Sequence, residues 1–260
     1  MLRSVDDIKG YTFLATDGEI GRVKDVLFDD REWTVRYLVA DTRKWLPGRK
    51  VLISPVSVRG VDEGERALDV NLSKHQIETG PPLDEHQPVS RRHEIALAGF
   101  FPWPQYWGAP GPYPLTGRMS AEEPTGIARR PASRGEMADL AQAVDESVPE
   151  PALRSTNEVV NYRIHAVDGE IGHVDTFIID TGNWLVRYFV VDTRNWLPGR
   201  KVLLAPEWCE GVDWAGKTVS IALTKEQVQN SPQCDPARPI NEELQTRLFE
   251  YYRGLFTAKS

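Results

Sequence analysis

A long internal repeat limits what this chain can fold into more than any other feature of its sequence. Residues 41–52 read DTRKWLPGRKVL and residues 192–203 read DTRNWLPGRKVL, so eleven of twelve letters agree at an offset of 151. The same offset aligns Pro55 with Pro206 without a gap. A pattern that returns at a fixed offset indicates two copies of one structural unit. Each copy has about 80 residues, which is near the lower limit for an independent hydrophobic core.

Composition restricts the class of protein. The formal net charge of −7 argues against a general nucleic-acid binder, whose affinity comes mainly from neutralising phosphates. The two cysteines, Cys209 and Cys234, are too few for a disulfide framework. The first residues show no signal-peptide pattern, and no apolar run is long enough to span a bilayer. We expect a cytoplasmic protein without a membrane segment.

Each copy has the pattern of β structure. In residues 11–23 the pair Asp17-Gly18 lies between two apolar runs, and Asp168-Gly169 repeats it. Asp-Gly favours a tight hairpin turn because glycine accepts a positive φ at little cost. We assign all four residues to turns and not to chemistry, because aspartate in a turn hydrogen-bonds to its own backbone.

The next strands follow from alternation and from breaks in it. Alternation fails near Lys24-Asp25, which indicates a β-bulge where a small barrel bends. Residues 33–41 place Trp33 and every second residue after it on one face, and the far end of this strand is apolar on both faces. Pro-Gly turns and short strands ending at Pro55 and Pro206 come next.

Helix starts can be recognised after the last strand of each copy. The pairs Ser73/Gln76 and Thr224/Gln227 have the spacing of capping boxes. Ser90 and its equivalent Asn241 are good N-caps, each followed by an amphipathic segment. The sequence therefore predicts an all-β, β-rich fold of two small tandem barrels, each followed by a short helix.

The predicted boundaries follow the repeat and the composition. Between the copies, proline, glycine, alanine and charged residues dominate without a sustained apolar period, which indicates a flexible linker. We expect a first barrel, a trailing helix with an aromatic-proline segment, the linker, a second barrel and a C-terminal helix, at residues 1–83, 84–108, 109–152, 153–234 and 235–260.

The hairpin and the strands after it resemble the PRC-barrel family. The matching residues are Asp17, Gly18, Ile20, Gly21, Val23 and Pro55, with Asp168, Gly169, Ile171, Gly172, Val174 and Pro206 in the second copy. The family includes the cytoplasmic domain of the photosynthetic reaction-centre H subunit and the C-terminal domain of a ribosome maturation factor. The resemblance implies two PRC-type barrels that dock onto other macromolecules and share no catalytic residues. It covers roughly residues 2–83 and 153–234, and neither the linker nor the two trailing helices. The sequence shows no membrane helix like that of the first relative, which argues against a photosynthetic role, and no separate N-terminal barrel like that of the second, which argues against a ribosomal role. Residues 88–108 are also similar to the tail of stand-alone bacterial members.

No constellation for catalysis stands out, and we expect no enzyme, cofactor or metal site. The five histidines lack metal-ligand spacing and read as surface residues. A serine elbow, CxxC, a phosphate-binding glycine loop and HExxH are all absent from the sequence. The duplicated unit offers neither an acid–base pair nor a nucleophile with its base.

The repeated loop is the stronger candidate for a binding surface. It carries two matching sets of side chains, namely Trp45, Arg49 and Lys50 and Trp196, Arg200 and Lys201. One interpretation is packing, with each tryptophan covering the mouth of its barrel and each arginine pairing with Asp41 or Asp192. Burying a tryptophan removes about 200 Å² from water, or roughly 5 kcal/mol gross. The other interpretation is a paired interaction surface, because tryptophan and arginine dominate binding hot spots.

An aromatic segment after the first copy is a second candidate surface. It carries Trp103, Tyr106 and Trp107 between prolines. Aromatic residues outside a folded unit adhere to other surfaces unless they dock. We expect them to dock on the first barrel, or else on a partner.

These observations favour a non-enzymatic interaction or assembly module. Its partner is another protein or a second copy of the chain, as in a homodimer. The alternative is an RNA- or ribosome-associated accessory factor, or a small-ligand binder. That role would use the basic loop residues Arg43, Arg49, Lys50, Arg194, Arg200 and Lys201.

Overall fold

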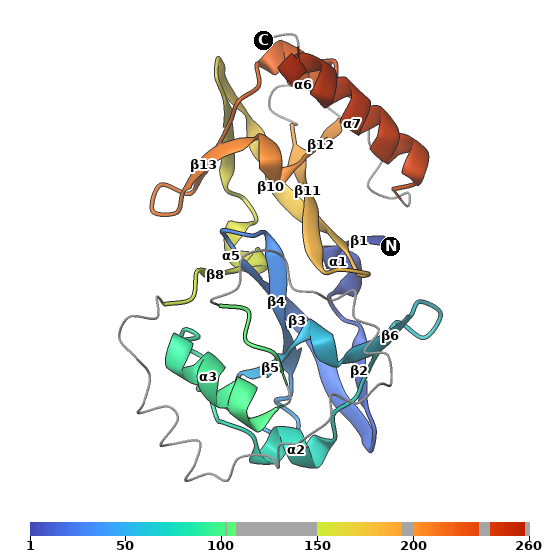
Figure 1. Cartoon of the computed structure of the whole chain (residues 1–260), viewed down its shortest axis with the longest axis vertical. Coiled ribbons are helices and arrows are strands. Elements are labelled where there is room, and N and C mark those ends of the chain that lie inside the picture. Colours follow the sequence, from blue (N-terminus) through green and yellow to red (C-terminus); the bar gives the residue numbers. More distant parts are fainter. Residues whose placement is uncertain (102, 108–149, 194–199, 234–239, 258–260) are drawn as a thin grey trace, which may run out of the picture. The chain divides into compact units, whose positions relative to one another are not determined.

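A computed structural model describes residues 1–101, 103–107, 150–193, 200–233 and 240–257. Most of the predicted linker at 109–152, Trp196 and Cys234 lie outside the described residues. The structure is β-rich with a few short helices, as predicted (Figure 1). No helix among the described residues is both long and apolar enough to cross a membrane.

The first copy begins with short elements and continues into two long strands. Its elements are β1 (Leu2–Ser4), α1 (Val5–Ile8), β2 (Thr12–Ala15), β3 (Gly18–Asp29), β4 (Thr34–Asp41), β5 (Val51–Ile53), η1 (Pro55–Ser57), β6 (Val58–Asp62), β7 (Ala67–Val70), α2 (Lys74–Thr79) and α3 (Arg91–Phe100).

The second copy repeats this order, and all eleven elements start at an offset of 150 or 151. They are β8 (Leu153–Ser155), α5 (Thr156–Val159), β9 (Arg163–Ala166), β10 (Gly169–Asp180), β11 (Leu185–Asp192), β12 (Lys201–Leu204), η2 (Pro206–Trp208), β13 (Cys209–Asp213), β14 (Thr218–Ile221), α6 (Lys225–Gln229) and α7 (Glu242–Thr257). The repeat in the sequence is therefore also a repeat of secondary structure.

The strands of each copy pair in the same order. In the first copy the order is β4-β3-β2-β7-β6, with β5 beside β4, and in the second it is β11-β10-β9-β14-β13, with β12 beside β11. The pairs β2–β7 and β9–β14 are parallel. Among the described residues neither path closes on itself, so each copy is observed as an open sheet and the two small barrels expected from the sequence are not confirmed.

The first strand of each copy belongs to the unit that the other copy builds. The structure divides into one compact unit of residues 8–154 and 182–184, and another of residues 1–7, 155–181 and 185–260. Strand β1 pairs with β10, and β8 pairs with β3. Boundaries drawn from the repeat alone, at 1–83 and 153–234, miss this exchange. Both strands read Leu-Arg-Ser, so each fits either partner.

Equivalent hydrogen bonds hold the two exchanged strands. The amide of Thr181 donates to the carbonyl of Met1 at 2.9 Å, and the amide of Asp30 donates to that of Ala152 at 2.9 Å. The Arg154 guanidinium adds an ion pair to Asp30 at 2.9 Å. The exchange is therefore reciprocal, as expected from two nearly identical strands.

The hairpin is present in each copy, but its turn lies one residue earlier than predicted. Ala15 pairs with Gly18, so Thr16 and Asp17 form the turn and Gly18 already belongs to β3. The Asp17 carboxylate accepts a hydrogen bond from the amide of Lys74 at 2.7 Å, and Asp168 accepts one from Lys225 at 2.8 Å. The aspartate therefore ties the hairpin to the start of a helix that lies 57 residues further along the chain, and not only to its own turn.

Other local predictions are confirmed. The register of β3 against β4 shifts between Val23 and Asp25, which places the bulge at Lys24. Both capping boxes form, at Ser73 and Thr224. Ser90 caps α3 by accepting a hydrogen bond from the amide of His93 at 3.3 Å.

Strand β4 differs from its predicted pattern. It begins at Thr34, because Trp33 lies in the preceding turn with φ at 52°. Residues 34–40 are buried on both faces, including Arg36, which is 3% exposed. The equivalent Arg187 is exposed. Alternation could not show this difference, since the side chains that cover Arg36 come from outside the strand.

One crossing point fixes the geometry of each copy. Gly21 has φ at +152°, and a Cβ placed there would lie 2.0 Å from the carbonyl oxygen of Asp41. Gly172 meets Asp192 at the same distance in the second copy. Only glycine allows β3 to pass the end of β4 this closely.

Gly21→Ala should therefore lower the free energy of unfolding by about 3 kcal/mol or more, because it adds a backbone clash to an unfavourable φ. Urea denaturation followed by circular dichroism measures this. Gly10→Ala is the matched control: Gly10 has φ at +87° with nothing within 4 Å, so alanine there should cost only about 1–2 kcal/mol. Equal losses in the two variants would contradict the role of the crossing.

The strand exchange predicts that the two halves stay together after the chain is cut. If a specific protease site is inserted between residues 120 and 130, the cleaved fragments should elute together from a sizing column without denaturant. Each fragment supplies a strand to the other unit.

The control for this cut is a variant with Arg3→Pro and Arg154→Pro, since proline disrupts strand pairing. Its fragments should separate more readily after cleavage. Fragments of the unsubstituted chain that separate at micromolar concentration would contradict the exchange.

Candidate functional site

The repeated loop of the first copy connects β4 to β5 and forms a defined turn. The carbonyl of Thr42 accepts hydrogen bonds from the amides of Trp45 at 3.0 Å and Leu46 at 2.8 Å. The Leu46 side chain is 9% exposed. Gly48 has φ at +74°, a conformation that favours glycine after the proline. The loop therefore presents Trp45 in one fixed position.

Trp45 is held against the start of β3. Its indole Nε1 donates to the carbonyl oxygen of Ile20 at 2.6 Å. The ammonium of Lys74 lies 5.2 Å from the centre of the Trp45 ring, within range of a cation–π interaction. The ring is half-buried, so part of it remains accessible. The side chain therefore has both a packing role and an exposed surface.

A cavity of about 740 Å³ lies beside this ring. Strand β3, the repeated loop and the start of α2 line it, through Glu19, Ile20, Gly21, Arg22, Asp41, Arg43, Lys44, Trp45 and Lys74. A cavity of this size falls in the range typical of ligand sites. Of the three side chains proposed from the sequence for this loop, only Trp45 lines the cavity, and β3 and α2 also contribute to it.

Positive charge predominates in the lining, which has four basic and two acidic side chains. One acidic group is already paired, because Arg43 donates to both carboxylate oxygens of Asp41, at 2.9 and 2.6 Å. This pairing lowers the pKa of Asp41 to about 2, so the carboxylate stays ionised. The remaining basic side chains, Arg22, Lys44 and Lys74, outnumber Glu19.

Arg49 and Lys50 do not line the cavity. The Arg49 guanidinium donates to the carbonyls of Glu78 at 2.8 Å and Gly80 at 3.1 Å, at the end of α2. Lys50 donates to the carbonyl of Gln87. The packing interpretation paired Arg49 with Asp41, but the Asp41 carboxylate binds Arg43 instead. Arg49 and Lys50 fasten the loop to the segments that follow it.

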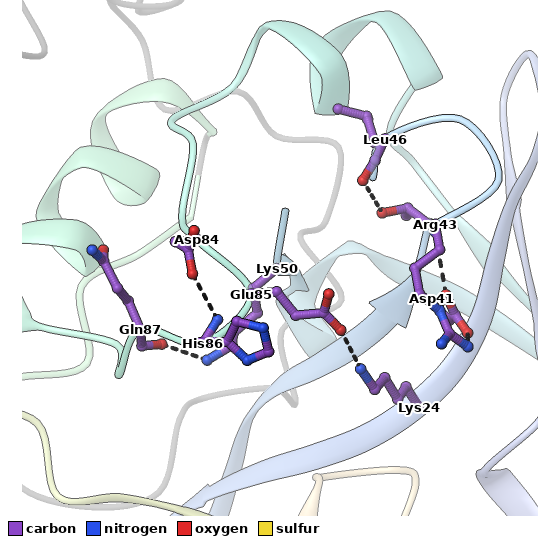
Figure 2. Close-up of polar contacts among 10 residues, drawn as sticks. Lys24, Asp41, Arg43, Leu46, Lys50, Asp84, Glu85, His86 and Gln87 are labelled. Carbon is purple, nitrogen blue, oxygen red and sulfur yellow. Dashed lines mark hydrogen bonds and ion pairs between the residues drawn. The ribbon is translucent and has the colours of Figure 1, made fainter. Parts of the chain in front are cut away.

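The surroundings of Lys50 form a network of polar contacts (Figure 2). Lys24, at the bulge of β3, pairs with Glu85 at 2.6 Å, and Asp84 accepts a hydrogen bond from the amide of His86 at 2.9 Å. Burial lowers the pKa of Lys50. The bulge therefore directs a side chain toward the segment that follows α2.

The second copy shares the arginine contact and differs at the lysine. Arg200 donates to the carbonyl of Ser231, the equivalent of Gly80. Lys201 forms an ion pair with Asp175 at 2.6 Å. Asp175 is the equivalent of Lys24 in the first copy. Trp196 and the neighbouring loop residues lie outside the described residues.

Trp103 belongs to the core and not to an exposed surface. It is 7% exposed, donates from Nε1 to the hydroxyl of Ser57 at 2.7 Å, and stacks on Phe101 with ring centres 4.4 Å apart. Tyr37 of β4 lies beside it at 6.3 Å. The aromatic segment therefore docks on the first copy at this residue, and Trp103 is removed from the candidate interaction surface.

Tyr106 and Trp107 cover a polar cluster on the same copy. The Tyr106 hydroxyl donates to Glu94 at 2.7 Å, and the Arg36 guanidinium lies 4.0 Å from the centre of its ring. Arg91 pairs with Glu94 at 2.6 Å and lies 4.5 Å from the centre of the Trp107 ring. Burial raises the pKa of Glu94. Both aromatic residues are half-buried.

The second copy achieves equivalent cover with other residues. Trp208 stands where the first copy has Ser57, and its ring lies 3.8 Å from that of Tyr252 in α7. Tyr252 is fully buried. A small residue admits a tryptophan from the tail in one copy, whereas the other copy supplies the tryptophan itself. Position 57/208 could have signalled this from the sequence, because the repeat changes from serine to tryptophan there.

The described residues contain no group of three or more histidine, cysteine or acidic side chains that could hold a metal ion. Burial raises the pKa of Cys209 to about 12, so its thiol remains protonated. His93 is not the surface residue that the sequence suggested: it is half-buried, and burial together with Lys50 and Arg49 lowers its pKa to about 4.

Comparison with known proteins supports the interpretation of the first copy. Residues 2–77 match the model of the PRC-barrel domain. This part of the chain is a PRC-barrel domain. A search of curated proteins finds no match. The matched region contains the whole lining of the cavity, so the candidate site lies within the PRC-barrel domain.

Sequence reasoning missed Arg22, Lys44 and Lys74 of this PRC-barrel domain. No sequence motif marks Lys74 as a residue of the cavity, because it reaches the cavity only when α2 packs on the hairpin. Arg22 and Lys44 could have been noticed from the sequence, because they are basic positions at which the two copies differ. The second copy has His173 in place of Arg22 and Asn195 in place of Lys44.

The lowered pKa of His93 predicts a pH-dependent stability. An unfolded histidine has a pKa near 6.5, so below that pH the unfolded chain binds the proton more tightly than the folded one. The stability that depends on neutral His93 is complete above about pH 6.5 and declines as the pH falls toward 4. We expect a loss on the order of 1–3 kcal/mol.

His93→Gln should reduce this dependence, measured as the urea midpoint between pH 7 and pH 4. His75→Gln, at an exposed position on α2, should leave the slope unchanged. Identical slopes in His93→Gln and the unsubstituted chain would contradict the assignment.

Proposed function

We propose that this chain is a non-enzymatic protein-interaction or assembly module with two PRC barrels in tandem. Residues 2–77 supply the first. Residues 153–234 would be the second, which is supported by the common offset of 151 and by the matching strand order. The proposed partner is another protein or a second copy of this chain, in the cytoplasm.

The cavity beside Trp45 is the observation that carries this proposal. It combines a half-buried tryptophan, exposed basic side chains and a rigid loop. Tryptophan and arginine are the residues that contribute most often to binding hot spots. The pinned position of Trp45 reduces the entropy that a partner would have to overcome on binding.

The absence of enzymatic activity remains part of the proposal. The cavity lining contains no serine, cysteine or histidine, and its aspartate is engaged by Arg43. General acid–base chemistry requires a group that can exchange a proton near neutral pH. The pKa of about 2 makes Asp41 unsuitable for that task.

Binding of RNA or of a small ligand is the second candidate function. Four of the residues expected to serve it, Arg49, Lys50, Arg200 and Lys201, bind groups of the protein itself. The role would therefore fall to the basic lining of the cavity. Nucleic-acid affinity grows with the number of phosphates neutralised, and this lining offers few cations in a chain of net charge −7.

Affinity capture with the intact chain tests the interaction module. We expect the unsubstituted chain to retain a partner or to self-associate by light scattering, and Trp45→Ala with Trp196→Ala to reduce this at least about fivefold, because a hot-spot truncation costs more than about 1 kcal/mol. Arg59→Ala, at an exposed position of β6, is the control. A monomer that retains no protein from its host would contradict the proposal.

A further inference from the structure

We propose that the cavity beside Trp45 binds an acidic segment of a partner protein. Carboxylates of that segment would meet Arg22, Lys44 and Lys74, and an apolar side chain would lie against the indole. This inference rests on the proposed function and specifies the chemistry of the partner.

The internal repeat provides a comparison within one chain. Of the nine residues that line the cavity, seven are identical at the equivalent positions of the second copy. The two that differ are Arg22, which becomes His173, and Lys44, which becomes Asn195. Both differences remove positive charge from the second copy. The parts that shape the cavity are thus common to both copies, whereas its excess of positive charge belongs to the first.

The positive charge of this cavity is directed toward solvent. The bidentate pair between Arg43 and Asp41 cancels one charge of each sign at its edge. The side chains of Arg22 and Lys44 are exposed, and Lys74 lies against the indole at 5.2 Å. The chain has a net charge of −7, so this cluster is a positively charged patch on a protein that is negatively charged as a whole. Such a patch attracts carboxylates and orients them before contact.

The apolar contact comes from the Trp45 indole, which is half-buried and keeps part of its ring accessible. Ile20 is 1% exposed and holds the indole through its carbonyl oxygen, which accepts the Trp45 hydrogen bond. The volume of about 740 Å³ accommodates a few side chains but not a folded domain. A short acidic stretch with one aromatic or aliphatic residue therefore matches both the size and the charge of this site.

A protein segment fits these observations better than RNA. Nucleic-acid binding depends on many phosphate contacts along a groove, whereas the basic residues here surround one cavity. The acidic remainder of the chain would repel a long polyanion. Binding of RNA is retained as an outcome of the test.

The probe is a short fluorescein-labelled peptide in which Glu and Asp residues surround one Phe, with the Gln/Asn version of the peptide as its neutral counterpart. Fluorescence anisotropy with the full chain at about 50 mM salt keeps electrostatic attraction effective over roughly 10–15 Å. We expect the acidic peptide to bind, the neutral one to bind more weakly, and raised salt to weaken the acidic peptide alone. Arg22→His and Lys44→Asn should each reduce affinity about two- to fivefold.

The repeat also supplies a matched control for net charge. Arg22→His combined with His173→Arg leaves the formal charge of the chain unchanged, because it moves one arginine to the equivalent place in the other copy. Affinity should remain reduced in this double variant, as it is in Arg22→His alone. Affinity restored by His173→Arg would show a non-specific charge effect and would overturn the site.

Two further results would overturn the inference. One is an equal affinity for the acidic and neutral peptides. The other is preference for a single-stranded RNA oligonucleotide of the same length, with loss of RNA binding in Arg22→His. If the acidic peptide fails while the intact chain still captures a partner in a Trp45-dependent manner, the interaction module stands and only the acidic character of the partner is wrong.

Discussion

The close passage of β3 over the end of β4 is the constraint on which the rest of each copy depends. Gly21 brings the backbone of β3 against the carbonyl of Asp41, where a Cβ would stand 2.0 Å away. The residue before the glycine, Ile20, accepts the hydrogen bond of the Trp45 indole, and Asp41 on the other side of the contact pairs with Arg43. The cavity is the space left around that crossing, so its shape follows from a glycine and its charge from the side chains nearby.

Both copies keep this crossing, and they differ in the side chains that cover the sheet. Gly172 repeats the contact of Gly21 in the second copy. The cover over the sheet is provided differently, by Trp103 from the tail in one copy and by Trp208 with Tyr252 in the other. Reciprocal exchange of β1 and β8 joins the units in addition to the chain between them. Identical Leu-Arg-Ser strands make this exchange possible, because neither sheet distinguishes its own first strand from the other.

Prediction from the sequence succeeded where the cause was local. The bulge at Lys24, the capping boxes at Ser73 and Thr224 and the N-cap at Ser90 each depend on a few neighbouring residues. It failed where the cause was distant. Arg49 was paired with the wrong acceptor because the carbonyls at the end of α2 approach it only in the folded chain. Burial of His93 was missed for the same reason, since alternation and spacing carry no information about other segments.

The sequence by itself determined the duplication, the β-rich character and the repeated loop, because identity at a fixed offset and local propensity need no knowledge of contacts. Only the tertiary structure decided which sheet receives each first strand, and which side chains surround the cavity. Both outcomes depend on segments far apart in the chain. Lys74 meets Trp45 in the folded chain, where its amide also donates to Asp17, and no pattern within either segment predicts that contact.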